Sequence, residues 1–324
     1  MTKKTKPKIK LGFMNALSIL SAVFLFSLLL KNSQLANSEV ARALKVCAEM
    51  LIPSLFPLAV ASEIVTNTGA IEKITNQFST PIAKILGVSK TATTPYFIGL
   101  FGGYSASSKS AVLLYQNGKI SKEDCESIIA LSGIPSLAFF TGFIGVGIFK
   151  NSKMGWKFWL ISLLSTLILG LINRAFFKQN SPQFWGKISA KKPQKSLPKI
   201  VVDAITHSAY AMLIICACVV FFSVLSAVLR LYLDRISLPE SIKNIALGTL
   251  EITKGISSCI EIENINFRAI FCSFLVGWSG FCVHFQVMAL CEDTNISFEK
   301  YFIFKVLQGV VCTLLALIVF SFKF

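Results

Sequence analysis

Apolar residues along the chain gather into long blocks that are separated by shorter polar or basic stretches. Clear blocks cover residues 11–30, 156–173, 200–229 and 301–322, each with few or no charges. About 20 apolar residues in a helix cross the hydrocarbon core of a bilayer, since each residue adds about 1.5 Å. The pattern therefore predicts membrane-spanning helices rather than elements of a soluble core.

Other blocks of similar length contain helix-breaking or polar residues. The interrupted blocks are residues 42–66 with Pro53 and Pro57, 95–115 with Gly102-Gly103, 126–149 with Gly133 and Pro135, the more polar 242–262, and 267–290 with Gly277 and Gly280. Proline and glycine weaken or end a helix, so these blocks predict broken helices or re-entrant hairpins. We predict an all-α integral membrane protein with about seven or eight transmembrane helices plus re-entrant hairpins.

The composition excludes an ordinary soluble domain. Hydrophobic residues make up 54% of the 324 residues and charged residues only 15%, whereas soluble domains carry about 25% charge. There are 32 basic and 16 acidic residues, a net charge of +16. In a membrane protein this excess is typical of cytoplasmic loops that face anionic lipid. We therefore expect membrane lipid as a partner and no nucleic acid.

Basic residues also predict the orientation in a bacterial cell membrane. Five lysines lie within residues 1–10, and residues 174–199 form a basic linker. If both are cytoplasmic, as the positive-inside rule predicts, an even number of crossings separates them. Residues 95–115 are the best candidate for a block that does not cross. A secretory signal is the alternative for residues 11–30, but its apolar core would be only about 7–15 residues long.

Short matches between the two halves predict an internal repeat. In chain order they are residues 50–52 with 212–214, 103–105 with 277–279, and 120–123 with 296–299. We divide the chain into residues 1–37 (basic N-terminus and first helix), 38–150 (first repeat), 151–200 (connecting helix and basic loop) and 201–324 (second repeat). Inverted repeats with broken helices are typical of secondary transporters, which hold substrate at the breaks. The alternative is that the breaks are kinks in a bundle without a transport role.

The first broken block carries a candidate substrate-binding site. Its residues are Gly103, Tyr104, Ser105, Ser107, Ser108 and Lys109. The glycines end one half-helix, the serines can cap the next, and the helix N-terminus with Lys109 favours an anion. Tyr104 offers a ring for stacking. The alternative is that these small residues allow close helix packing while Lys109 snorkels to the interface.

The second half contributes further candidates for substrate binding. They are Glu251, Thr253, Trp278, Ser279, His284 and Gln286. Trp278 is a candidate to clamp an aromatic ligand, and a lone histidine such as His284 is more often structural than functional. Carboxylates near membrane depth, namely Glu49, Glu63, Asp203 and Glu251, are candidates for a proton or sodium relay. The alternative is that they pair with Arg42, Lys45 or Lys254.

Signatures of enzymes and metal sites do not occur in the sequence. It contains no Gly-x-Ser-x-Gly elbow, P-loop or His-Glu-x-x-His, and only two histidines. Five of the nine cysteines lie inside apolar runs, where free cysteine packs as a small hydrophobe. We therefore expect no catalytic residues, no metal and no cofactor.

Several segments resemble the sporulation integral membrane proteins with nucleoside-recognition (gate) domains, a family related to concentrative nucleoside transporters. The resemblance covers residue 40 to the end of the chain. It is carried by residues 51–57, 102–104 with Lys109, 117–121, 140–143, 212–214, 250–255 and 283–287. It implies gate-like repeats and, because one stage V sporulation member is implicated in moving dipicolinic acid, transport across the outer forespore membrane.

Three departures from the family pattern bear on the substrate. Ser105 replaces the usual proline, Ser132-Gly133 stands where asparagines precede Pro135, and Lys254 replaces asparagine. The expected function is secondary transport of a small organic anion, first of all dipicolinate, coupled to a proton or sodium. The alternatives are a nucleoside or other metabolite carrier, or a membrane protein that serves spore maturation without transport. A homo-oligomer is compatible with the sequence.

Overall fold

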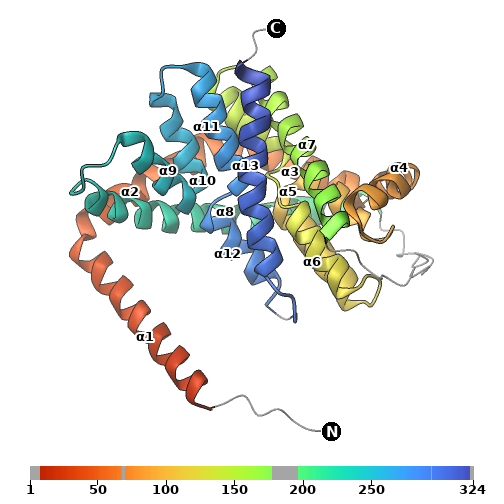
Figure 1. The fold of residues 1–324 in the computed structure, drawn as a ribbon, viewed down its shortest axis with the longest axis horizontal. Helices are drawn as coiled ribbons and strands as arrows, with labels where there is room; N and C mark the ends of the chain where they lie inside the picture. The colour runs from red at the N-terminus through yellow and green to blue at the C-terminus, as the bar shows by residue number, and fades with distance from the viewer. Residues whose placement is uncertain (1–7, 68–69, 177–195, 293, 322–324) are drawn as a thin grey trace.

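The computed structural model describes residues 8–67, 70–176, 196–292 and 294–321, and these residues are helical apart from short connections. The helices before residue 177 are α1 (Lys8–Lys31), α2 (Ser33–Val46), the π-helix η1 (Cys47–Leu51), α3 (Ile52–Asn67), α4 (Ala70–Leu86), α5 (Thr93–Gln116), α6 (Lys122–Leu131), the π-helix η2 (Phe139–Ile148) and α7 (Ser152–Phe176). Those after it are α8 (Leu197–Leu233), α9 (Glu240–Leu250), α10 (Ile252–Ser258), the 3-10 turn η3 (Cys259–Glu261), α11 (Ile265–Trp278), α12 (Phe281–Leu290) and α13 (Glu299–Ser321). Helix α1 extends away from the other helices (Figure 1).

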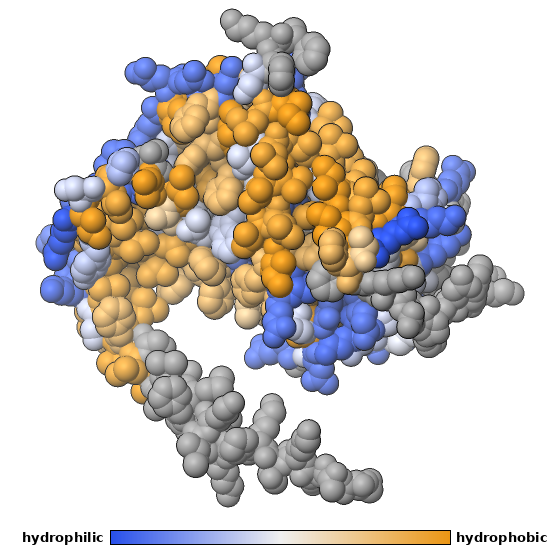
Figure 2. Space-filling model, in the orientation of Figure 1, coloured by the Kyte–Doolittle hydropathy of each residue, from blue (hydrophilic) through white to orange (hydrophobic). Residues whose placement is uncertain are grey.

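The outer surface of the helices is apolar, as lipid contact requires. On α13 the exposed positions include Ile303, Val306, Val310, Leu314 and Leu317, spaced by three or four residues along one face. The opposite face of α13 is buried and contains lysine and glutamine. Figure 2 shows an apolar band over α7, α11 and α13, with hydrophilic residues gathered towards the edges. A helix that turns its apolar side outward and its polar side inward fits lipid better than water.

Four helices among the described residues are long and apolar enough to cross a membrane. They are Ser152–Phe176, Leu197–Leu233, Ile265–Leu290 and Glu299–Ser321, and a fifth span arises if Ser33–Leu51 and Leu55–Ala61, which meet at 51°, form one bent span. The prediction of an all-α protein with membrane spans is therefore confirmed, whereas the count of seven or eight spans stays a prediction. Residues 1–7 and 177–195 of the predicted cytoplasmic segments lie outside the described residues.

One helix was not expected from the apolar blocks. Helix α4 (Ala70–Leu86) packs against α5 and α7, yet its sequence alternates apolar residues with Glu72, Lys73 and Lys84. Such an amphipathic helix has no continuous apolar run, so a search for membrane-length blocks passes over it.

Helix α7 lies unusually close to η2, at Gly155. A β-carbon on this residue would be 2.4 Å from the carbonyl oxygen of Phe140 and 2.7 Å from Cα of Thr141. Both neighbours are backbone atoms, which cannot rotate away. Glycine is therefore required for the contact between α7 and η2, which resembles the small-residue crossings of membrane helices.

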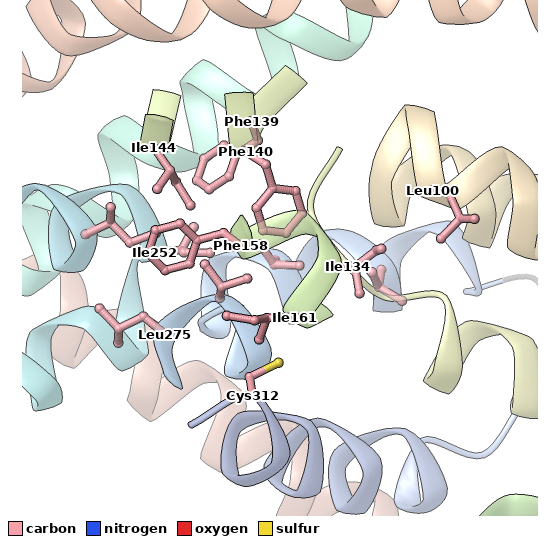
Figure 3. Packing of buried hydrophobic residues seen from close by; sticks show 14 of the residues in the cluster. Leu100, Ile134, Phe139, Phe140, Ile144, Phe158, Ile161, Ile252, Leu275 and Cys312 are labelled. Carbon is pink, nitrogen blue, oxygen red and sulfur yellow. The ribbon is translucent and has the colours of Figure 1, made fainter. Parts of the chain in front are cut away.

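The buried core joins helices from both predicted repeats. Figure 3 shows Phe140 of η2 and Phe158 of α7 in one cluster with Leu275 of α11 and Cys312 of α13. Helix α13 contacts α6, α7 and α11. The two halves of the chain therefore share a single core.

An exposed ion cluster fixes the turn between α8 and α9. Lys243 Nζ lies 3.0 Å from Asp234 and 3.1 Å from Glu240, and Arg230 contacts both carboxylates. The hydrogen bond from Lys243, together with the charge of Arg230, holds the pKa of Asp234 below its usual range. The cluster closes the turn that leads from the long helix α8 into α9 and α10.

Candidate functional site

Four interruptions in the helices form the centre of the candidate site. In the first half they are Gly103, with φ 81° and ψ −174° inside α5, and residues 132–136 between α6 and η2. In the second half they are Glu251, extended between α9 and α10, and Ser279-Gly280, with φ 76° and 83° between α11 and α12. The sequence predicted the breaks at Gly102-Gly103 and Gly133-Pro135, and these are confirmed.

The two interruptions of the first half lie against each other. A β-carbon on Gly103 would be 2.9 Å from the backbone nitrogen of Ser136. Beside this contact, the hydroxyls of Ser107 and Ser132 are hydrogen-bonded, and both side chains are buried. Glycine is required at residue 103 because its φ is positive and the opposite backbone leaves no space for a side chain.

The two interruptions of the second half lie against each other in the same way. A β-carbon on Gly280 would be 3.2 Å from the backbone nitrogen of Ile252 and 3.4 Å from the carbonyl oxygen of Leu250. Trp278 Nε1–H donates to the carbonyl of Thr249 at 3.1 Å. Each half thus contains two broken segments whose breaks meet at a glycine with positive φ. The internal repeat itself stays a prediction.

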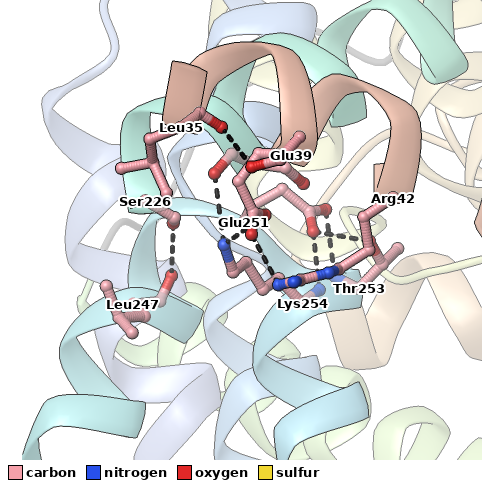
Figure 4. Close-up of polar contacts among 10 residues, drawn as sticks. Leu35, Glu39, Arg42, Ser226, Leu247, Glu251, Thr253 and Lys254 are labelled. Carbon is pink, nitrogen blue, oxygen red and sulfur yellow. Dashed lines mark hydrogen bonds and ion pairs between the residues drawn. The ribbon is translucent and has the colours of Figure 1, made fainter. Parts of the chain in front are cut away.

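Glu251 caps helix α10 from a fully buried position (Figure 4). Its carboxylate accepts hydrogen bonds from the backbone N–H of Thr253 at 2.9 Å, the Thr253 hydroxyl at 2.5 Å and the N–H of Lys254 at 2.6 Å. The predicted pairing of Glu251 with the Lys254 ammonium does not occur, because Lys254 Nζ binds Glu39 at 3.0 Å and the carbonyl of Ser223 at 3.2 Å. The carboxylate therefore compensates the positive end of its own helix.

Other carboxylates of the predicted relay lie in ion pairs. Glu49 lies 3.9 Å from Lys45, as the pairing alternative predicted, and both side chains are exposed. Glu63 lies 3.3 Å from His207. The relay stays a prediction, with Glu251 as its fully buried member.

The two pairs of interruptions approach each other through α5 and α12. These two helices are in contact. On α12, Gln286 is buried and its amide donates to Cys282 Sγ at 3.4 Å. The structure therefore brings α5 of the first half against α12 of the second half.

His284 is fully buried inside an aromatic shell. Its ring centroid lies 4.6 Å from that of Trp278 and 5.4 Å from those of Tyr301 and Phe302. His284 Nδ1 is 2.9 Å from the Tyr301 hydroxyl, whereas Nε2 has no hydrogen-bond partner among the described residues. Trp278, predicted as a ligand clamp, here packs its ring against His284.

Lys109 does not lie with its predicted serine partners. Its side chain is exposed on α5, while Ser107 and Ser108 are buried and Ser105 is half-buried. Thr253 and Ser279 are also buried, and the Ser279 hydroxyl donates to the carbonyl of Val276 at 3.2 Å. The structure therefore does not place the predicted cation beside the hydroxyls.

A different lysine, Lys305 of α13, occupies the interior. It is fully buried, and its ammonium donates to the carbonyl of Gly133, in the interruption at residues 132–136, and to Gln308 Oε1 at 2.8 Å. Gln308 in turn lies 3.5 Å from the Ser165 hydroxyl of α7. None of the ion pairs among the described residues includes Lys305. Sequence reasoning missed this residue, although it is a lysine inside an apolar block.

A surface recess of about 370 Å³ lies elsewhere, at the end of α12. Phe285 and Met288 line it together with residues of the connection to α13. None of its lining residues belongs to the four interruptions, so it is separate from the candidate site.

Comparison with known proteins gives one informative likeness. The chain is 25% identical over 333 aligned residues to the sporulation integral membrane protein YlbJ of Bacillus subtilis (strain 168), covering 92% of this chain and 81% of that protein. No family model and no solved structure matches the chain. The likeness and the apolar helices support an integral membrane protein related to sporulation. The nucleoside-recognition domain, the dipicolinate carrier and the forespore membrane stay predictions.

Proposed function

We propose that the protein is a secondary carrier that moves a small organic anion, first of all dipicolinate, across a membrane of a sporulating bacterium. The observation that carries this proposal is the meeting of the four helix interruptions inside an apolar shell. Gly103 contacts the backbone of Ser136, and Gly280 contacts that of Ile252. Helix α5, which carries Gly103, is in contact with helix α12, which follows Gly280.

Physical chemistry favours a binding site at such a place. Backbone groups at a helix break cannot face lipid, because each unsatisfied group costs several kcal/mol there. Breaks persist where they are buried in protein or line a polar path, and secondary transporters use them to hold substrate and coupling ion. Two pairs of breaks in one chain, with buried Ser107, Glu251 and His284 around them, fit this use better than four unrelated kinks.

The charge around the interruptions favours an anion. Helix α12 begins at Phe281, immediately after the second pair, and Lys305 supplies a buried ammonium beside the first pair. Helix N-termini and ammonium groups both attract carboxylates. Dipicolinate combines two carboxylates with a flat ring, and the likeness to a sporulation membrane protein makes it the first substrate to test.

The expected result is uptake of labelled dipicolinate by liposomes that contain the purified protein, in the presence of a proton or sodium gradient. Gly280→Ala should lower the uptake at least about ten-fold, equivalent to about 1.4 kcal/mol, because its new methyl group pushes on the opposite break. Lys109→Ala should leave uptake unchanged, since Lys109 is exposed.

A matched control separates backbone strain from the site itself. Gly118 also has a positive φ, 65°, but a β-carbon there would meet nothing within 4 Å. Gly118→Ala should therefore retain uptake. If folded wild-type protein moves neither dipicolinate nor other organic anions under either gradient, the carrier proposal is wrong. Uptake of labelled uridine instead would favour the nucleoside carrier.

A further inference from the structure

Lys305 differs from the other buried lysine among the described residues in its surroundings. Lys243 is nearly buried as well, but it lies within 3.1 Å of two carboxylates, those of Asp234 and Glu240. Half-buried Lys254 has the carboxylate of Glu39. Lys305 is fully buried, and the oxygens that it contacts belong to a backbone carbonyl and an amide.

A charged Lys305 is therefore incompletely compensated. Burying an ammonium ion costs several kcal/mol even after relaxation of the protein. The carbonyl of Gly133 lies just beyond the last residue of α6, where the helix dipole supplies about half a negative charge. The neutral amide of Gln308 and the half negative charge at the end of α6 do not balance the full positive charge of Lys305. The site therefore favours an added anion.

A polar atom without a partner, His284 Nε2, lies on α12, and the His284 ring contacts Tyr301, which is one helical turn before Lys305. Tyr301 precedes Lys305 by four residues on the same buried face of α13 and contacts His284 Nδ1. Through Tyr301, His284 is attached to the same buried face of α13 that carries Lys305. In the tautomer where the Tyr301 hydroxyl donates to Nδ1, the unpartnered Nε2 carries the proton and is a hydrogen-bond donor.

We propose that Lys305 and His284 form a carboxylate-binding subsite of the carrier. A substrate carboxylate replaces the Gly133 carbonyl as the partner of the Lys305 ammonium and accepts a hydrogen bond from His284 Nε2–H. This inference rests on the proposed transport of an organic anion. Gly133 belongs to the first half of the chain and His284 to the second. The exchange of partners at Lys305 therefore couples anion binding to both halves.

The test compares two probes that differ by one carboxylate, dipicolinate and picolinate. Their dissociation constants are measured by calorimetry on the purified full-length protein. Wild type should bind dipicolinate about ten-fold more tightly than picolinate, since only dipicolinate engages Lys305 and a second anchor together. Lys305→Met should weaken dipicolinate binding about ten-fold and bring the two constants close to each other. Lys109→Met, the matched change at an exposed lysine, should alter neither.

The ratio of the two constants identifies the role of Lys305. A structural defect would weaken both probes equally and keep their ratio, whereas loss of a carboxylate contact removes the advantage of the second carboxylate. A wild-type ratio that survives in Lys305→Met therefore overturns the subsite, even if uptake of dipicolinate by wild type upholds the carrier. Wild type that neither binds nor moves dipicolinate overturns both.

A second variant covers the case in which Lys305→Met does not elute as a single species in size-exclusion chromatography. His284→Phe keeps a ring inside the aromatic shell and removes the Nε2 donor. Dipicolinate should then bind several-fold more weakly and lose its advantage over picolinate. The melting temperature should fall because the buried Tyr301 hydroxyl loses its partner Nδ1, but that loss alone would not change the ratio of the two constants. Unchanged dipicolinate affinity in His284→Phe contradicts the proposed subsite.

Discussion

Gly155→Ala is expected to destabilise the folded protein by about 3 kcal/mol, because the added methyl group overlaps with backbone atoms of η2. Its β-carbon would be 2.4 Å from the Phe140 carbonyl oxygen, so α7 must move away from η2. Trp156 and Trp159 follow directly in α7 and report on this contact. Thermal unfolding of detergent-purified protein, followed by tryptophan fluorescence, should show a clearly lower transition.

The control for this prediction is Gly147 of η2, whose nearest neighbour is a flexible side chain. A β-carbon on Gly147 would meet the terminal methyl group of Met50 at 3.0 Å, which a flexible side chain can withdraw. Gly147→Ala should change stability by less than about 1 kcal/mol. Equal melting temperatures for Gly155→Ala and wild type would show that α7 and η2 do not pack as described.

Glu251→Ala is the second substitution with a large expected effect, again about 3 kcal/mol of lost stability. The buried donors of Thr253 and Lys254 are left without partners at about 1–3 kcal/mol each, a cost that already includes the ordinary loss of an N-cap, about 1 kcal/mol. Glu251→Gln keeps one acceptor oxygen and should lie between wild type and Glu251→Ala. The same fluorescence-detected unfolding in detergent measures all three.

Asn264 offers a matched control for the cap of Glu251. It caps α11 by accepting hydrogen bonds from the N–H groups of Asn266 and Phe267, both at 3.0 Å, but it is exposed to the surroundings. Asn264→Ala should cost only about 1 kcal/mol, since other partners can reach the freed N–H groups. A similar loss in Glu251→Ala and Asn264→Ala would contradict the importance of burial at Glu251.

Two of the helix breaks were predictable from sequence because glycine and proline weaken a helix locally, as Gly103 and Pro135 do. Proline alone does not decide the outcome, because Pro57 lies inside α3 and Pro81 inside α4. The long apolar blocks likewise predicted α7, α8 and α13. Helix α4 was missed because its apolar face forms only after the chain is coiled.

The lysine in the interior was not predictable in the same way. Lys109 lies among serines next to a break, and Lys305 lies near the start of an apolar block, where a lysine usually snorkels to the interface. Which one points inward depends on how each helix is rotated about its axis. The neighbours of α13, namely α6, α7 and α11, decide this rotation, and they are distant in sequence.

Helix α13 also sets the order of events during biosynthesis. It is translated after α6, α7 and α11, the three helices that it contacts. Until it inserts, the Gly133 carbonyl lacks its ammonium donor, and His284 lacks Tyr301. The earlier helices can therefore enter the membrane one by one, but the contacts of Gly133 and His284 form only after α13 has left the ribosome.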